Sequence, residues 1–206
     1  MPAYVPLRDA LAAGISVRAA GLLRRQHDHG LADHAMAVAR LTIAACRTLG
    51  VESTRTGAYA RAALFHDVGK VEISRRILDR KGPLSEEEWA LVRTHAERGG
   101  HLVGAVGELK DVAAIVRHHH ERWDGAGYPD GLAGEDIPFG ARVVLACDAF
   151  EAMTASRSYQ PTLTTDAALE ELRAGAGGQF DPVVAAAVVD MVTSSDRFIR
   201  GSSSRP

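Results

Sequence analysis

The stretch that decides the fold of this chain is HHHERWDGAGYP, residues 118–129. Before it, Leu109, Val112 and Val116 recur at helical spacing, and the same register places His119 and His120 at the edges of that apolar face. The glycines and the proline that follow cannot continue a helix and let the backbone approach a ligand closely. The pattern therefore predicts two imidazoles at the end of a helix, on its buried side, and places His118 on the opposite, solvated side.

Adjacent histidines on a buried face have two interpretations. A single neutral imidazole is commonly a hydrogen-bonded core residue. Two neighbouring rings in one buried space need several acceptors or one metal ion. Residues elsewhere in the chain decide between these interpretations.

The composition is that of an ordinary soluble domain. The chain has 206 residues, 46% of them hydrophobic and 24% charged, with a net charge of -2. This balance argues against binding to long nucleic acid, although a small phosphorylated ligand remains open. No secretory leader or membrane span is recognisable, and Cys46 and Cys147 lie apart in apolar patterns, so we expect a cytoplasmic protein.

The hydrophobic periodicity is helical throughout. A capping box of Ser85 and Glu88 marks one helix start, with Leu91, Val92 and Leu102 expected to face inward. We predict an all-α helical bundle, divided into an N-terminal extension (1–30), one domain (31–196) and a flexible tail (197–206). The predicted helices of the domain cover residues 31–49, 54–67, 85–103, 109–117, 138–155, 165–173 and 182–192.

Polar side chains recur on the faces of these helices that should be apolar. Burying a carboxylate without a partner costs roughly several kcal/mol of folding free energy, even after the protein relaxes around it. Nitrogen and oxygen ligands without thiolate suit iron, manganese or zinc, and Asp67 could bridge two ions. Two ions about 3.5–4 Å apart could together be bound by all of these side chains. The candidate metal ligands are His34, His66, Asp67, His95, His119, His120 and Asp148.

A family resemblance is carried by several separated motifs. HDVGK (66–70) is followed by HHER (119–122), DGAGYP (124–129), Asp148 and finally GQFDP (178–182). In this order they resemble the HD-GYP family, the metal-dependent phosphodiesterases of bacterial cyclic di-GMP signalling. The resemblance implies a helical bundle of the HD-domain type with a metal site in its centre.

The resemblance also implies a role for individual residues of the site. Asp67 and Lys70 would serve catalysis, Lys70 and Arg157 would contact substrate phosphate, and Tyr128 would shape the substrate pocket. A hydroxide bridging two iron or manganese ions would open cyclic di-GMP to linear pGpG, with GMP as a further product. Candidate partners are cyclic di-GMP, a diguanylate cyclase domain and a second copy of the chain. The implied metal sets are His34, His66, Asp67 and Asp148 for one ion, and Asp67, His95, His119 and His120 for the other.

Four positions depart from the family pattern. Gly30 stands where some members have a glutamate that binds a third metal, so we expect two metals. Ser158 and Gln160 stand where proline and a basic residue are common, and Glu151 replaces an aspartate. These changes leave two alternatives open. One is an inactive signalling module that binds a cyclic dinucleotide or a cyclase partner, and the other is a hydrolase of another nucleotide.

Overall fold

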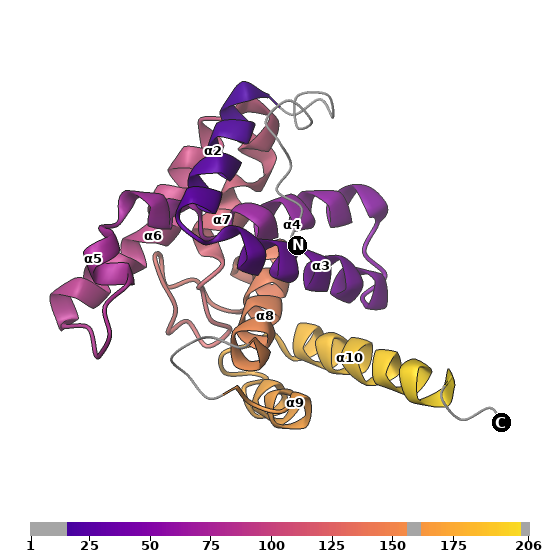
Figure 1. Ribbon diagram of the computed structural model, residues 1–206. Helices are drawn as coiled ribbons and strands as arrows, with labels where there is room; N and C mark the ends of the chain where they lie inside the picture. The colour runs from indigo at the N-terminus through magenta and orange to yellow at the C-terminus, as the bar shows by residue number, and fades with distance from the viewer. Residues whose placement is uncertain (1–15, 156–161, 203–206) are drawn as a thin grey trace.

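The chain folds as an assembly of helices, seen in the computed structural model (Figure 1). The structure describes residues 16–155 and 162–202, without the side chains of Val17 and residues 195–202. Within these residues there is no β-strand, and the prediction of an all-α fold is confirmed. The α-helices are α2 (Val17–Asp28), α3 (Ala32–Thr48), α4 (Ser53–Phe65), α5 (Arg75–Leu78), α6 (Glu86–Gly104), α7 (Ala113–His118), α8 (Phe139–Thr154), α9 (Thr165–Ala174) and α10 (Pro182–Ser202). The 3-10 helices are η1 (Val68–Glu72), η2 (Gly107–Val112) and η3 (Gly134–Asp136).

Side-chain caps fix where two of the helices begin. The Ser85 hydroxyl accepts the Glu88 N–H at 3.3 Å, and the Glu88 carboxylate accepts the Ser85 N–H at 3.0 Å. Asp181 accepts the Val183 N–H at 2.8 Å at the start of α10. Both predicted helix starts are confirmed, because these oxygens satisfy N–H groups that have no partner inside the helix.

The segment before the histidine pair differs from its prediction. Instead of one helix over 109–117, a 3-10 helix, η2, leads into α7, which ends at His118. Leu109 and Val112 are still buried together, since residues three apart share a face in both kinds of helix. His119 follows as the C-cap of α7.

The core lies around α8. Helix α3 packs against both α4 and α8, while α6 packs against α7 and η1 (Figure 1). Helix α8 buries residues on nearly every side, among them Ala141, Val144 and Cys147. Cys46 and Cys147 are both buried free thiols. Helices α3, α4 and α7 pack against α8, and α6 packs against α7, so the buried faces of these helices lie close together.

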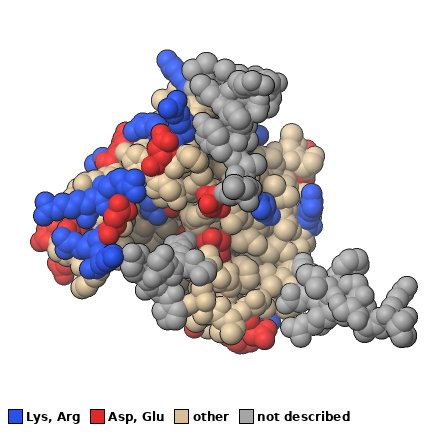
Figure 2. Space-filling view, viewed as in Figure 1, with Lys and Arg blue, Asp and Glu red and all other residues tan. Residues whose placement is uncertain are grey.

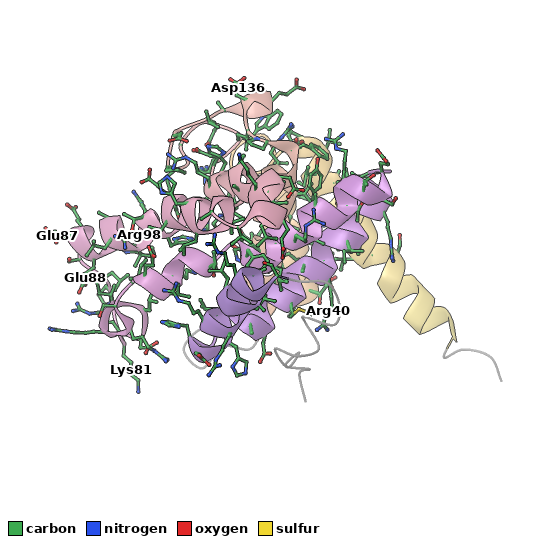
Figure 3. All side chains as sticks on the ribbon, turned by 90° about the horizontal axis from the view of Figure 1, so that it is seen from above. Arg40, Lys81, Glu87, Glu88, Arg98 and Asp136 are labelled. Carbon is green, nitrogen blue, oxygen red and sulfur yellow. The ribbon has the colours of Figure 1, made fainter. Side chains whose placement is uncertain are left out.

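The N-terminal part of α6 projects from the bundle. The buried residues of α6 begin at His95, and Leu91 is 45% exposed, so the prediction that Leu91 faces inward is wrong. Val92 and Leu102 are half-buried. Charged side chains cover this projecting end in Figure 2, and Figure 3 shows Glu87 and Glu88 at its tip. Helical periodicity indicates which face of a helix is apolar, but it does not show how much of the length of that helix is covered by other elements.

Both ends of the predicted domain show additional packing. Helix α2 contributes Ala19 and Leu22 to the same core, and the Gln26 amide donates to the Leu64 carbonyl at 3.0 Å. Helix α10 continues to Ser202, beyond its predicted end at 192. The boundaries at residues 31 and 196 stay predictions. Across the described part of the chain, none of the helices is long and apolar enough to span a membrane.

Candidate metal centre

The HD dipeptide lies where α4 gives way to η1. His66 is the C-cap of α4, and Asp67 is the N-cap of η1. The next turn crosses α6 so closely that a Cβ atom on Gly69 would lie 2.0 Å from the His95 carbonyl oxygen. Glycine at this position therefore lets η1 bring Asp67 against the histidine of α6.

Three imidazoles are held in the same way by their own helices. Nδ1 of His66, His95 and His119 lies 2.7, 2.6 and 2.7 Å from the carbonyl oxygen three residues earlier. A carbonyl can only accept, so Nδ1 carries the proton in each ring. In the neutral ring Nε2 then has a free lone pair, which is the form that binds a metal ion.

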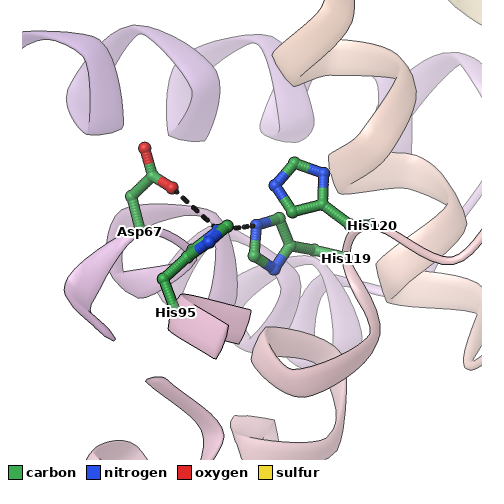
Figure 4. A group of neighbouring side chains, drawn as sticks. All are labelled: Asp67, His95, His119 and His120. Carbon is green, nitrogen blue, oxygen red and sulfur yellow. Dashed lines mark hydrogen bonds and ion pairs between the residues drawn. The ribbon is translucent and has the colours of Figure 1, made fainter. Parts of the chain in front are cut away.

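These lone pairs face one another. The Nε2 atoms of His95 and His119 lie 3.4 Å apart (Figure 4). Nε2 of His66 and Oδ1 of Asp67 are buried and have no hydrogen-bond partner among the described residues. Acceptors that converge in this way repel each other unless a cation lies between them, so the residues present fit a bound metal.

Asp67 stands between two groups of ligands. Its Oδ1 lies 3.3 Å from Nε2 of His95, whereas its Oδ2 lies 3.6 Å from Nε2 of His66 and 3.9 Å from Nε2 of His34. Lys70 places its ammonium group 2.7 Å from the same Oδ2. The carboxylate thus presents one oxygen to each group, as a bridging ligand does.

The second group joins α3 and α8. His34 Nε2 lies 3.0 Å from Asp148 Oδ1, and His66 Nε2 lies 3.7 Å from the same oxygen. On its other side, His34 Nδ1 donates to Glu151 Oε2 at 2.6 Å. Glu151 therefore fixes the ring of His34 with Nε2 pointing into the cluster.

Protonation favours ligands over charged imidazoles at the centre. Burial lowers the pKa of His95 to about 4 and that of His120 to about 3. Burial, with the neighbouring imidazoles, also lowers the pKa of His119 well below its usual value. Burial alone would raise the pKa of Asp148, but the hydrogen bond from His34 holds it at about 2. At neutral pH the centre therefore offers neutral rings at His95, His119 and His120. Burial alone would lower the pKa of His34, but the hydrogen bond to Asp148 and the surrounding carboxylates raise it, so a metal ion would displace a proton from this ring.

All seven predicted ligands come together. The donor atoms of each group lie within 4.8 Å of one another. One group contains the same residues as the second implied ligand set, and the other contains those of the first set except Asp67, whose Oδ2 lies 3.6 Å from Nε2 of His66. The prediction of a His and Asp cluster at the centre of the bundle is confirmed. The groups are Asp67, His95, His119 and His120, and His34, His66 and Asp148.

Tyr128 packs on a ligand. Its ring stacks on His120 with 4.9 Å between centroids, and the Arg93 guanidinium lies 5.5 Å from the Tyr128 centroid. The aromatic ring thus holds His120 in place from one side. Its predicted contact with substrate stays a prediction. Arg157, Ser158 and Gln160 lie outside the described residues.

Other polar residues of the HHHERWDGAGYP stretch brace its loop. Glu121 is buried and accepts the N–H groups of Asp130 and Gly131 at 2.7 and 3.1 Å. His118, which we expected to be solvated, instead places Nε2 2.8 Å from Asp130 Oδ2. That expectation is wrong because the loop folds back over the end of α7.

Glu151 is the site residue whose role the sequence analysis missed. We treated it as a departure from the family pattern at the substrate. Glu151 follows Asp148 by three residues, which puts both acids on one face of α8. This spacing could have indicated that Glu151 lies beside the ligand cluster.

Comparisons with known proteins agree with this geometry. The family model described as HD domain matches residues 17–184, and the chain belongs to the HD domain family. Over 186 residues it is 34% identical to 3'3'-cGAMP-specific phosphodiesterase 3 of Vibrio cholerae, a match that covers 90% of this chain and 40% of that protein. Over 136 residues it is 40% identical to a cyclic di-GMP phosphodiesterase response regulator of Xanthomonas campestris, covering 65% of this chain and 36% of that one. The chain thus spans less than half the length of these relatives. Their names confirm the resemblance to HD-GYP phosphodiesterases.

Solved structures share the fold. An HDG"Y"P protein from Bdellovibrio bacteriovorus superposes with a TM-score of 0.62 at 24% identity, covering 79% of this chain and 52% of that one. The HD domain of the Listeria monocytogenes phosphodiesterase PgpH, in complex with cyclic di-AMP, superposes with a TM-score of 0.61 at 18% identity, covering 87% and 96%. At these identities the likeness supports the fold alone.

Proposed function

We propose that this chain is a metal-dependent phosphodiesterase that hydrolyses cyclic di-GMP. One observation carries the proposal: Asp67 presents an oxygen to each of two groups of imidazole and carboxylate side chains. The names of the relatives, which act on cyclic di-GMP or 3'3'-cGAMP, support a cyclic dinucleotide as the substrate. Nitrogen and oxygen donors without thiolate favour iron or manganese.

The proposed centre holds two divalent ions. The first ion would be held by His34, His66, Asp67 and Asp148, and the second by Asp67, His95, His119 and His120. When bound, the ions would lower the pKa of a water lying between them and take up charge on the phosphoryl oxygens.

The chain's own residues bind and orient the phosphodiester. Lys70, with its ammonium group beside Asp67, is close enough to the ligands to contact a non-bridging phosphate oxygen. Arg157 would contact the phosphate from the other side, as the family resemblance implies. Attack of water on phosphorus would form one P–O bond and break the bond to a ribose 3′-oxygen, which takes up a proton and leaves as a hydroxyl. The product would be linear pGpG, with GMP after a second hydrolysis of the same kind. We further propose a cytoplasmic site of action and a diguanylate cyclase domain as a partner.

The direct test is turnover by the metal-loaded protein. Protein reconstituted with iron or manganese without oxygen is incubated with cyclic di-GMP, and products are separated by chromatography. We expect pGpG to accumulate, and we expect H95A to abolish turnover. The matched control is H101A, because His101 lies on the same helix, α6, but is exposed. Binding of cyclic di-GMP without any turnover in either metal would contradict the proposal and indicate a binding module.

A further inference from the structure

A cavity lies beside the metal centre, under the projecting end of α6. Its volume is about 290 Å³, at the lower end of the range for ligand sites. It can therefore admit one part of a dinucleotide. The lining residues come from α5, from the start of α6 and from the segments around them: His29, Leu31, Lys70, Arg75, Ile77, Leu78, Asp79, Arg80, Leu84, Trp89 and Val92.

The cavity adjoins the metal centre at two residues. Lys70 lines the cavity, and its ammonium group lies 2.7 Å from Asp67 Oδ2. Val92 also lines the cavity, and its carbonyl accepts the Nδ1 proton of His95. A ligand with a phosphate at the centre can therefore extend past Lys70 into this cavity.

The chemistry of the lining suits a flat aromatic group attached to phosphate. Trp89 is 52% exposed although it forms part of the wall, so one large aromatic surface is open to a ligand. Aliphatic side chains also line the cavity, namely Leu31, Ile77, Leu78, Leu84 and Val92. Stacking of a nucleobase on such a ring is a common and sequence-tolerant mode of recognition.

Cations outnumber acids around the same cavity. Arg75 is held by Asp79 at 3.1 Å, and Arg80 by Glu88 at 2.8 Å. A guanidinium carries five N–H donors, so each of these arginines retains donors for a phosphate. Lysine and arginine side chains gather over this side of the molecule in Figure 2.

We propose that this cavity is a subsite for one purine base of the cyclic dinucleotide, with Trp89 stacked on the base and Arg75 near the second phosphate. The inference rests on the proposed function, since it places the scissile phosphate at Lys70. It assigns substrate selection to residues outside the set of metal ligands.

The test compares two substrates of the metal-loaded protein. Cyclic di-GMP carries purines, whereas its abasic analogue keeps the cyclic sugar–phosphate ring and has no aromatic group. We expect W89A to raise KM for cyclic di-GMP about tenfold, with little change in kcat. The ratio of kcat/KM for cyclic di-GMP to that for the abasic analogue falls accordingly. W89F restores most of the loss because a phenyl ring still stacks, and R75Q also raises KM.

Two neighbours serve as matched controls. Leu91 is exposed on α6, and Arg76 is exposed on α5, and both lie outside the lining. We expect L91A and R76Q to keep the wild-type KM. Equal KM values for W89A and L91A would overturn the subsite.

Failure of the proposed function has a different signature. If the wild-type protein cleaves neither substrate, the proposed activity is wrong, and the subsite is then tested by calorimetry with cyclic di-GMP. Weaker binding by W89A than by L91A supports the subsite, whereas equal binding by the two variants refutes it.

Discussion

The contact between η1 and α6 predicts a large effect of a single methyl group. In G69A the new Cβ would lie 2.0 Å from the His95 oxygen, 2.7 Å from the Gly99 nitrogen and 2.8 Å from the His95 carbonyl carbon. All three are backbone atoms, so no side-chain rotation relieves the clash, and the two elements must separate by about 1 Å. Overpacking of this kind costs about 3 kcal/mol. For a chain of this size we expect the Tm to fall by about 6–12 °C.

The assay is thermal and urea unfolding followed by circular dichroism, which give the Tm and the free energy of unfolding, with metal affinity measured on the same samples. The matched control is G57A, in the middle of α4, where the nearest atom to a new Cβ is Arg61 Nη1 at 3.8 Å. Removing a glycine from an open helical position should stabilise the protein by about 0.5–1 kcal/mol. The two substitutions thus have opposite expected signs. A G69A variant as stable as wild type would refute the close crossing of η1 and α6.

Three further predictions concern polar contacts. E151A should lower metal affinity about 10–100-fold, because His34 loses the carboxylate that orients it, whereas E151Q should retain most of the affinity; metal titration measures both. D181A should destabilise the fold by about 3–5 kcal/mol in urea unfolding, since it leaves the Arg142 guanidinium buried without its carboxylate. Hydrogen bonds from Arg117 and His118 lower the pKa of Asp130. The ionised carboxylate therefore stabilises the fold at pH values above the usual aspartate pKa, and this stabilisation is lost as the pH falls. In D130N the free energy of unfolding should depend less on pH in the acid range, as measured by unfolding at a series of pH values.

Each of these predictions has a contradicting outcome. Equal metal affinities for E151A and E151Q would show that the carboxylate does not orient the ring of His34. A D181A variant that unfolds at the wild-type urea concentration would argue against the buried ion pair. For D130N, an acid-unfolding curve parallel to that of wild type would remove Asp130 from the groups whose pKa is lowered by folding.

The metal cluster was predictable because its residues break a simple pattern. His95 stands on a face of α6 that is otherwise apolar, and a buried polar group needs a partner. Helical periodicity alone could not provide the partners, because they come from other helices, and the two ligand sets were implied only by the family resemblance. His34 and Glu151, for example, are 117 residues apart and meet only when α3 packs against α8.

The projecting end of α6 was not predictable for a different reason. Leu91 has the spacing of an inward residue, yet periodicity describes one helix and carries no information about what covers it. The cavity beside Trp89 could not be predicted for the same reason, because its lining residues come from several separate segments between residues 29 and 92. Local sequence rules describe elements, and cavities arise between elements.

We propose that one carboxylate, Asp67, is shared by two metal ions. Elemental analysis of protein purified without oxygen tests it most directly, with wild type compared with D67A and D148A. We expect two ions of iron or manganese per wild-type chain, the loss of both in D67A, and the loss of one in D148A. A wild-type chain that retains a single ion, or a D67A variant that keeps the wild-type metal content, would show that Asp67 does not bind two ions.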